Sequence, residues 1–370
     1  RVKPINKVIV LHLLSQLISN FLIFKTFIIM LKFIVGADIS KDKINFALRH
    51  LNSYLLEKEV KNTTSSLNKF IKEVKGLVKS VTKEKKSDFS LEFIMEHTGI
   101  YGNLLIECLS GQKVQMYVVP GLEIKNSTGI TRGKNDIIDA QRIADYGVRF
   151  SDKLKPYTLS DETVIQLKGL RTKRSQLVAM RAQLTQANDD NKKFMNKDVL
   201  KKITRINDPI VKELNVAIDK IETEIFDVVK SNDEVYENYK IAKSVPGVGP
   251  VIAIAFICAT DNFTKFESAK ALGSYCGVVP FDSSSGKYKG KNKVSPIANK
   301  ELKTLLQMGA LSIICGKSPF AAYYQKKVNV DKKNKMLAQN NVRNKILKTL
   351  FACIKNKTNY KPDYSFAFAA

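Results

Sequence analysis

The stretch Phe33-Ile-Val-Gly-Ala-Asp38 decides the fold that we predict for this chain. Its first five residues are apolar or small, which is typical of a short buried strand, and it ends on an acidic residue. Two more strand patterns follow, an alternation of apolar and polar residues over 44–48 and a segment over 53–60. Three such strands, separated by short turns, predict an antiparallel sheet at the start of the domain.

Helical and strand patterns then alternate along the chain. Apolar side chains recur at helical spacing over residues 65–81. The segments after it are expected to be a strand (91–95), a helix (104–109), a strand (114–119) and a helix that starts near Asn135. This order of elements predicts an α/β domain with a ribonuclease-H-like layout over residues 30–155.

Four acidic residues of this domain are candidates for a metal site. Asp38 and Glu96 each stand where a buried strand ends, and ligand crevices of open α/β sheets lie beyond strand ends. Asp136 and Asp139 are three residues apart on a helix and therefore share a face. Each residue alone could be a turn or helix cap. Together they predict a crevice in which Mg²⁺, or Mn²⁺, neutralises the clustered carboxylates and assists phosphoryl transfer.

The composition indicates a polyanionic partner. The 370 residues include 61 Lys+Arg against 35 Asp+Glu, a net charge of +26, which favours nucleic acid or an anionic membrane surface. Three His leave little scope for His-based catalysis. The five Cys are scattered and have no CxxC spacing, which argues against a zinc site or a disulfide framework and favours the reducing cytoplasm.

Residues 1–29 are set aside as an apolar leader outside the fold. Residues 8–31 are long and apolar enough to span a bilayer or to begin a signal peptide, but polar residues such as Ser15 and Asn20 interrupt them. Met30 resembles a natural start directly before the first strand. We therefore favour an upstream extension of the reading frame over a membrane anchor or a soluble helix.

Residues 156–240 are expected to form a long helical linker. Residues 159–239 contain one Pro, Pro209, and one Gly, Gly169, and their apolar residues recur at helical steps. Two helices with a break over 196–207 predict an antiparallel or intermolecular coiled coil, and a helical hairpin within one chain is the alternative. Basic residues along one face fit either nucleic-acid contact or a solvated surface.

Residues 241–320 are predicted to be a mainly α-helical domain. Residues 244–250, Ser-Val-Pro-Gly-Val-Gly-Pro, precede an apolar run and have the form of a helix-hairpin-helix. In such a turn the backbone N–H groups at Gly247 and Gly249 could hold a DNA phosphate without reading the base sequence. A capped core helix would produce the same string of residues.

A polar, lysine-rich segment over residues 282–293 follows, and residues 321–370 are expected to form a basic helical tail. The segment would ordinarily be a flexible surface loop. Beside a metal site, one of its three consecutive serines could supply a hydroxyl nucleophile. The lysines predicted to bind nucleic acid are Lys287, Lys289, Lys291, Lys293, Lys300, Lys326 and Lys327.

Three motifs of the α/β domain are Gly-Ala-Asp-Ile-Ser-Lys (36–41), Glu-His-Thr-Gly-Ile-Tyr (96–101) and Asn-Asp-Ile-Ile-Asp-Ala (135–140). In this order they resemble the DEDD transposases of the IS110/IS1111 insertion-sequence group, which includes the Piv-type invertases. The N-terminal domain of that group is similar to the RuvC resolvase. The resemblance implies catalytic and metal-ligand roles for Asp38, Glu96, Asp136 and Asp139. Asn135 stands where the family often has Thr, which concerns the helix cap only.

The C-terminal part resembles the transposase-20 region of the same family, and the whole match runs from about residue 33 to 318. Its Gly-Leu-x-Pro, Ser-Gly and Ile-Ser-Lys-x-Gly-Asn elements correspond to residues 277–280, 285–286 and 294–300, with departures at Pro296 and Ala298. In the family the Ser before Gly attacks a DNA phosphodiester and forms a phosphoserine link. The resemblance therefore implies Ser285 as the nucleophile, with Ser284 as its substitute.

These observations predict a transposase, a site-specific recombinase that cleaves and rejoins double-stranded DNA through a serine ester. The resemblance further implies a structured guide RNA and a homo-oligomer, a dimer or a tetramer, and no membrane partner is expected. One alternative is a RuvC-like, Mg²⁺-dependent structure-specific endonuclease that uses water as its nucleophile. The other is a catalytically inactive nucleic-acid-binding protein.

Overall fold

The structure is a computed structural model that describes residues 31–83, 89–129, 135–282, 284–285, 288–290 and 292–362. The chain divides into two units, Arg1–Leu159 and Ser160–Ala370, which are described separately. The prediction for residues 1–29 lies outside the described residues.

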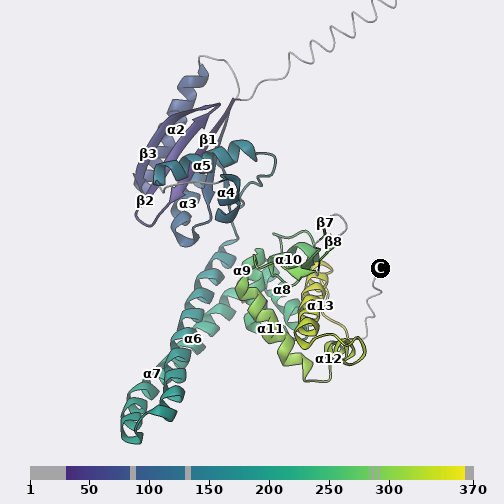
Figure 1. Cartoon of the computed structure of the whole chain (residues 1–370). Coiled ribbons are helices and arrows are strands. Elements are labelled where there is room, and N and C mark those ends of the chain that lie inside the picture. The colour runs from purple at the N-terminus through teal and green to yellow at the C-terminus, as the bar shows by residue number, and fades with distance from the viewer. Residues whose placement is uncertain are drawn as a thin grey trace, which may run out of the picture. The chain divides into compact units, whose positions relative to one another are not determined.

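The first unit contains a five-stranded sheet, whose first three strands are drawn in purple in Figure 1. Its strands are β1 (Leu31–Ile39), β2 (Lys43–His50), β3 (Ser53–Lys61), β4 (Phe89–Glu96) and β5 (Gln115–Val119), in the spatial order β3-β2-β1-β4-β5. Strands β1, β2 and β3 pair antiparallel, whereas β4 runs parallel to both β1 and β5. The predicted mixed α/β sheet is confirmed, and its strand order agrees with a ribonuclease-H-like layout.

Helices cover both faces of this sheet. They are α2 (Thr64–Lys83), η1 (Gly99–Gly102), α3 (Asn103–Gly111), α4 (Gly121–Ser127) and α5 (Asp136–Arg149). Phe33 and Val35 of β1 share one core with residues of α2 and α3, while Ile34 shares another with Ile143 and Ala144 of α5. Because successive side chains of a strand point to opposite faces, even-numbered residues of β1 face α5.

Two glycines allow α5 to lie unusually close to the sheet. A Cβ placed on Gly36 would lie 2.1 Å from the carbonyl oxygen of Ala140 and 2.5 Å from the backbone nitrogen of Ala144. A Cβ placed on Gly147 would lie 1.8 Å from Cδ1 of Ile94 in β4. The helix therefore packs against β1 and β4 at distances that only glycine permits at these two positions.

Gly36→Ala is expected to destabilise the protein, because the added methyl group overlaps backbone atoms of α5 that cannot rotate away. We expect the free energy of unfolding to fall by about 1–3 kcal/mol. Gly76→Ala in α2 is the matched control, since a Cβ there meets nothing within 4 Å. That variant should gain about 0.5–1 kcal/mol from higher helix propensity. Chemical denaturation of both variants measures the difference, and equal stabilities would contradict the packing described here.

The second unit is mostly helical. Its helices are α6 (Glu162–Phe194), α7 (Lys197–Lys230), α8 (Asp233–Ser244), α9 (Pro250–Thr260), α10 (Ala269–Tyr275), α11 (Lys300–Ile314), α12 (Pro319–Gln325), η2 (Lys326–Val330) and α13 (Lys335–Lys355). Short strands β6 (Pro280–Phe281), β7 (Ser284–Ser285), β8 (Tyr288–Lys289) and β9 (Lys293–Val294) lie between α10 and α11. Figure 1 shows α6 and α7 side by side as a helical hairpin, the alternative that the sequence left open.

Two features of this unit differ from the sequence predictions. The break between the long helices covers only Met195 and Asn196, because α7 runs from Lys197 through Pro209 and its apolar residues keep their helical spacing. Helix α13 is part of the core and not an appended tail, since residues such as Ile346 and Leu350 are fully buried.

Among the residues that the structure describes, no single helix is both long and apolar enough to cross a bilayer. One bent pair, Lys300–Ile314 with Pro319–Val330, meets the criterion by length and composition only.

Candidate active site

Asp38 and Glu96 lie next to each other across two parallel strands. The pairing of β1 with β4 extends to Ala37 and Met95, and Asp38 and Glu96 are the next residues on each strand. Met95 belongs to the core under α2 and Ile94 to the core under α5, so Glu96, like Asp38, is on the α5 side of the sheet. Both residues are partly buried. The strand geometry therefore directs both carboxylates toward one face.

Asp136 and Asp139 occupy the first turn of the helix on that face. The side chain of Asn135 caps α5 by accepting a hydrogen bond from the backbone N–H of Ile137 at 2.9 Å. The next residue after Asp139 is Ala140, whose carbonyl lies against Gly36 of β1. This close contact brings the acidic turn of α5 to the end of the strand that carries Asp38.

The four carboxylates are not gathered around a common point. Among the residues that the structure describes, no three His, Cys, Asp or Glu side chains form a group that could hold a metal ion. Asp139 forms an ion pair with Arg142 at 2.6 Å, and Asp136 lies 3.7 Å from Nζ of Lys43. Lys43 also donates a hydrogen bond to Glu59 at 2.7 Å, which, together with Asp136, raises the pKa of Lys43.

The donor set nevertheless suits a hard divalent cation. It consists of carboxylate oxygens only, the ligands that Mg²⁺ prefers. The side chains of Asp136 and Asp139 keep 48% and 28% of their surface exposed. Ion pairs between partly exposed groups stabilise a protein modestly, because water screens them. Rotation of the two aspartates away from Lys43 and Arg142 would leave their carboxylates available to a cation.

Gly121 determines where the carboxylate of Glu96 can lie. Gly121 follows Pro120 at the end of β5 and begins α4. A Cβ placed on Gly121 would lie 2.0 Å from Oε1 and 2.5 Å from Cδ of Glu96. Any side chain at position 121 would therefore push the Glu96 carboxylate out of its present place.

Gly121→Ala is expected to weaken divalent-cation binding about 10-fold, as loss of groups that orient a metal ligand commonly does. Stability should change little, because the overlap involves the mobile end of a flexible side chain. Titration calorimetry with Mn²⁺ and chemical denaturation measure the two effects. Gly111→Ala, where a Cβ meets nothing within 4 Å, is the control. Equal Mn²⁺ affinity of both variants would show that Gly121 does not position Glu96 for a metal.

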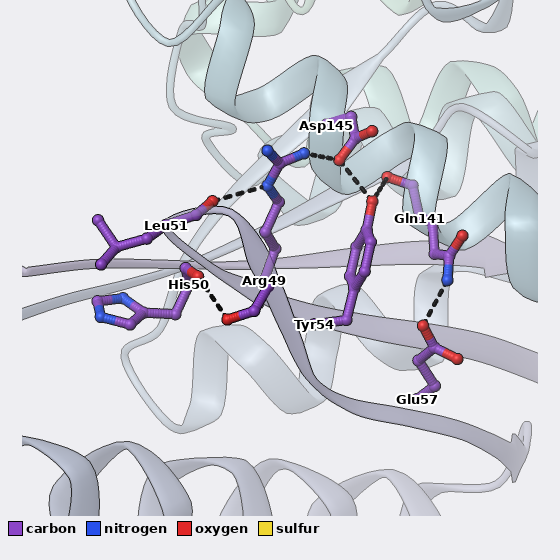
Figure 2. A network of polar contacts seen from close by, with 8 residues as sticks. Arg49, His50, Leu51, Tyr54, Glu57, Gln141 and Asp145 are labelled. Carbon is purple, nitrogen blue, oxygen red and sulfur yellow. Dashed lines mark hydrogen bonds and ion pairs between the residues drawn. The ribbon is translucent and has the colours of Figure 1, made fainter.

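A polar network fastens α5 to β2 and to β3 (Figure 2). Arg49 forms an ion pair with Asp145, and the hydroxyl of Tyr54 donates a hydrogen bond to the same carboxylate at 2.6 Å. Gln141 donates a hydrogen bond to Glu57. Burial raises the pKa of Tyr54, which keeps its hydroxyl protonated as a donor. The helix that carries the two aspartates is thus held both by apolar packing and by polar contacts.

The serine segment forms small hairpins where the sequence suggested a loop. Ser284 pairs with Lys289 and Ser285 with Tyr288, so β7 and β8 are antiparallel. Strands β6 and β9 pair in the same sense nearby. Such two-residue strands carry no periodic pattern long enough to detect in a sequence. Ser283, Lys287 and Lys291 lie outside the described residues.

The other predicted nucleic-acid contacts differ in their surroundings. Lys293, Lys300 and Lys326 are exposed. Lys327 forms an ion pair with Asp331 at 2.6 Å, which raises the pKa of Lys327. A role in DNA binding stays a prediction for all four.

The predicted phosphate-binding turn follows α8. Gly247 has a φ of +83°, and a Cβ there would lie 2.8 Å from the carbonyl oxygen of Gly309 in α11. Gly249 caps α9, whose residues 252–258 are buried. Gly247 is thus required by its backbone conformation and by its close contact with α11, and Gly249 serves as the N-cap of α9. Helix α9 is therefore a capped core helix, which is the alternative that the sequence left open. Phosphate binding by this turn stays a prediction.

Comparison with known families matches both halves of the chain. Residues 35–189 match the family DEDD_Tnp_IS110, described as a transposase, and residues 239–325 match the transposases of the IS116/IS110/IS902 family. The chain belongs to the IS110 family of transposases. Its four acidic residues fall within the first match and its serine segment within the second. Membership makes this transposase an enzyme that acts on DNA.

Individual relatives agree with this assignment. The transposase is 23% identical to the pilin gene-inverting protein of Moraxella bovis over 274 residues, 72% of this chain and 80% of the relative. It is 29% identical to a 44.8 kDa protein of insertion element IS116 from Streptomyces clavuligerus, over 27% of each chain. It is 31% identical to the transposase for insertion sequence element IS1111A of Coxiella burnetii, over 26% of each chain.

Among solved structures, RuvC of T. thermophilus in complex with a Holliday junction substrate is similar to part of the transposase. The TM-score is 0.25 and the identity 10%, and the similarity covers 34% of this chain and 99% of that one.

Two positions of this transposase that shape the site were missed from the sequence. Gly36 lies in the quoted first strand, but its contact with Ala140 joins residues that are far apart in the chain. One feature of the sequence could have pointed to Gly121, namely the Pro-Gly pair directly after the strand over 115–119.

Proposed function

We propose that this transposase is a recombinase that cleaves and rejoins the DNA of its insertion sequence through a serine–phosphodiester intermediate. Asp38, Glu96, Asp136 and Asp139 would hold Mg²⁺. The observation that supports this most strongly is the placement of all four at the α5 side of the ends of β1 and β4.

Ser285 would attack the phosphorus atom of the scissile phosphodiester. Its hydroxyl gives up a proton, the bond from Oγ to phosphorus forms, and the bond to the leaving deoxyribose oxygen breaks as that oxygen takes up a proton. When bound, Mg²⁺ would neutralise the negative charge that develops on the phosphate oxygens. The serine ester retains the energy of the original bond, so a deoxyribose hydroxyl can reverse the reaction and rejoin the strands without a nucleotide cofactor.

The partners are proposed on the family resemblance and on charge. A net charge of +26 favours binding of double-stranded DNA and of a structured guide RNA. Action as a homo-oligomer, a dimer or a tetramer, in the cytoplasm is proposed on the same resemblance.

A nucleic-acid-binding protein without catalysis is the second candidate function. It is favoured by the ion pairs of Asp136 with Lys43 and of Asp139 with Arg142. In this case the four carboxylates would serve only the surface electrostatics of the fold.

Mass spectrometry of trapped protein–DNA adducts tests the proposal. The full chain is incubated with Mg²⁺, its RNA and a duplex that carries the ends of its element, then denatured and digested with trypsin and nuclease. Cleavage after Lys270 and Lys287 releases a peptide that contains Ser283, Ser284 and Ser285. We expect a nucleotide on this peptide. DNA cleavage without an adduct would instead indicate water as the nucleophile, and no cleavage would favour the non-catalytic function.

A further inference from the structure

Arg343 is a buried cation that lacks a counter-ion among the described residues. It lies on α13 with only 9% of its surface exposed, and no carboxylate of the described chain forms an ion pair with it. Its Nε atom is buried and has no hydrogen-bond partner there. A buried guanidinium without compensation destabilises a fold, and native structures contain few such groups. Burial accordingly lowers the pKa of Arg343.

The face of α13 that carries Arg343 is directed toward the segment that precedes the serine strand. Asn340, one turn earlier, donates a hydrogen bond to the carbonyl of Val278 at 2.9 Å. Leu347, one turn later, lies 3.8 Å from the position of a Cβ on Gly273. Residues 340, 343 and 347 lie along one row of the helix surface. The Oδ1 atoms of Asn340 and Asn344 are also buried without a hydrogen-bond partner in the described chain, so this polar row is incompletely satisfied.

A second basic side chain reaches the same segment from α11. Nζ of Lys303 lies 3.7 Å, and its Cδ 3.6 Å, from the position of a Cβ on Gly277. Gly277 has a φ of +64°, a backbone conformation that favours glycine. No ion pair of Lys303 is found within the described part of the chain. Lys303 of α11 therefore lies beside Gly277, and the row of α13 that carries Arg343 contacts the next residue, Val278, through Asn340, a few residues before β7.

We propose that Arg343, together with Lys303, forms a binding site for a phosphate group of DNA beside the serine segment. The guanidinium can donate two parallel hydrogen bonds to a pair of phosphate oxygens, and the phosphate would compensate the buried charge. This inference rests on the proposed function, because the site would hold the DNA that the transposase recombines. Binding of a DNA phosphate is nevertheless measurable without catalysis.

Arg343→Met tests the site by two readouts that should diverge. Anisotropy titrations of a labelled DNA duplex with the full chain, without Mg²⁺ and over a range of KCl concentrations, give the salt dependence of binding. We expect the slope of log K against log salt to fall in magnitude by about 0.9, the value for one lost phosphate contact. Stability to denaturant should stay the same or rise, because an apolar side chain replaces an uncompensated charge.

Two further variants make the result decisive. Lys303→Met should lower the slope by a similar amount, even if Arg343→Met folds poorly. Lys240→Met, whose parent side chain is paired with Glu237 at 2.6 Å, should leave the slope unchanged. Unchanged slopes for both Arg343→Met and Lys303→Met would overturn the proposal, as would a smaller slope for RNA but not for DNA. A smaller slope in a protein that forms no serine adduct would retain this site and reject the serine mechanism alone.

Discussion

Ser285→Ala should abolish the covalent protein–DNA adduct and reduce strand exchange by a factor on the order of 10⁶, as loss of a serine nucleophile does in other enzymes. The methyl group of alanine cannot form the ester that links protein to DNA. DNA binding should be unchanged, because the substitution removes no charge. Denaturing gels of radiolabelled DNA after reaction with Mg²⁺ and RNA detect the adduct directly.

Ser284→Ala is the matched control for this prediction. Ser284 and Ser285 are neighbours in β7, and their partners in β8 are Lys289 and Tyr288. Each substitution removes one hydroxyl of the pair and leaves the other in place. An adduct that persists in Ser285→Ala and disappears in Ser284→Ala would transfer the role to Ser284. Full cleavage by both variants without a covalent adduct in either would refute serine chemistry.

Asp38→Asn should lower the rate of DNA cleavage by about 10²–10³-fold, the range typical of losing one preorganised electrostatic group. Asparagine has nearly the same shape as aspartate but carries no charge, so the fold should persist while Mn²⁺ affinity falls. Cleavage assays and titration calorimetry with Mn²⁺ measure the two losses. The reason for choosing Asp38 is its position beside Glu96 on the side of the sheet that α5 covers.

Asp42→Asn controls for the general effect of removing a negative charge. Asp42 is an exposed residue in the turn after β1, four positions from Asp38. We expect its cleavage rate and Mn²⁺ affinity to match those of the unaltered protein. Wild-type cleavage by Asp38→Asn would argue for the non-catalytic function, and equal losses in both variants would indicate a nonspecific charge effect.

The local sequence was sufficient for much of the first unit. The apolar run Phe33-Ile-Val-Gly-Ala ending on Asp38 predicts a buried strand from neighbouring residues alone, and the structure places its alternate side chains in two separate cores. The cap at Asn135 and the acidic first turn that follows it were also readable, because a helix start depends on adjacent side chains. The predicted break over residues 196–207 was wrong, because α7 runs as one helix from Lys197 and accommodates Pro209 in its interior.

By itself, the sequence determined the order of the elements, the strand ends that carry Asp38 and Glu96, and the helix turn that carries Asp136 and Asp139. Only the tertiary structure decided which side chains meet. It set Gly36 against Ala140, Gly121 against the carboxylate of Glu96, and Arg343 in a core without a counter-ion. Secondary structure follows from interactions over a few residues, whereas these contacts depend on close packing between segments far apart in the chain.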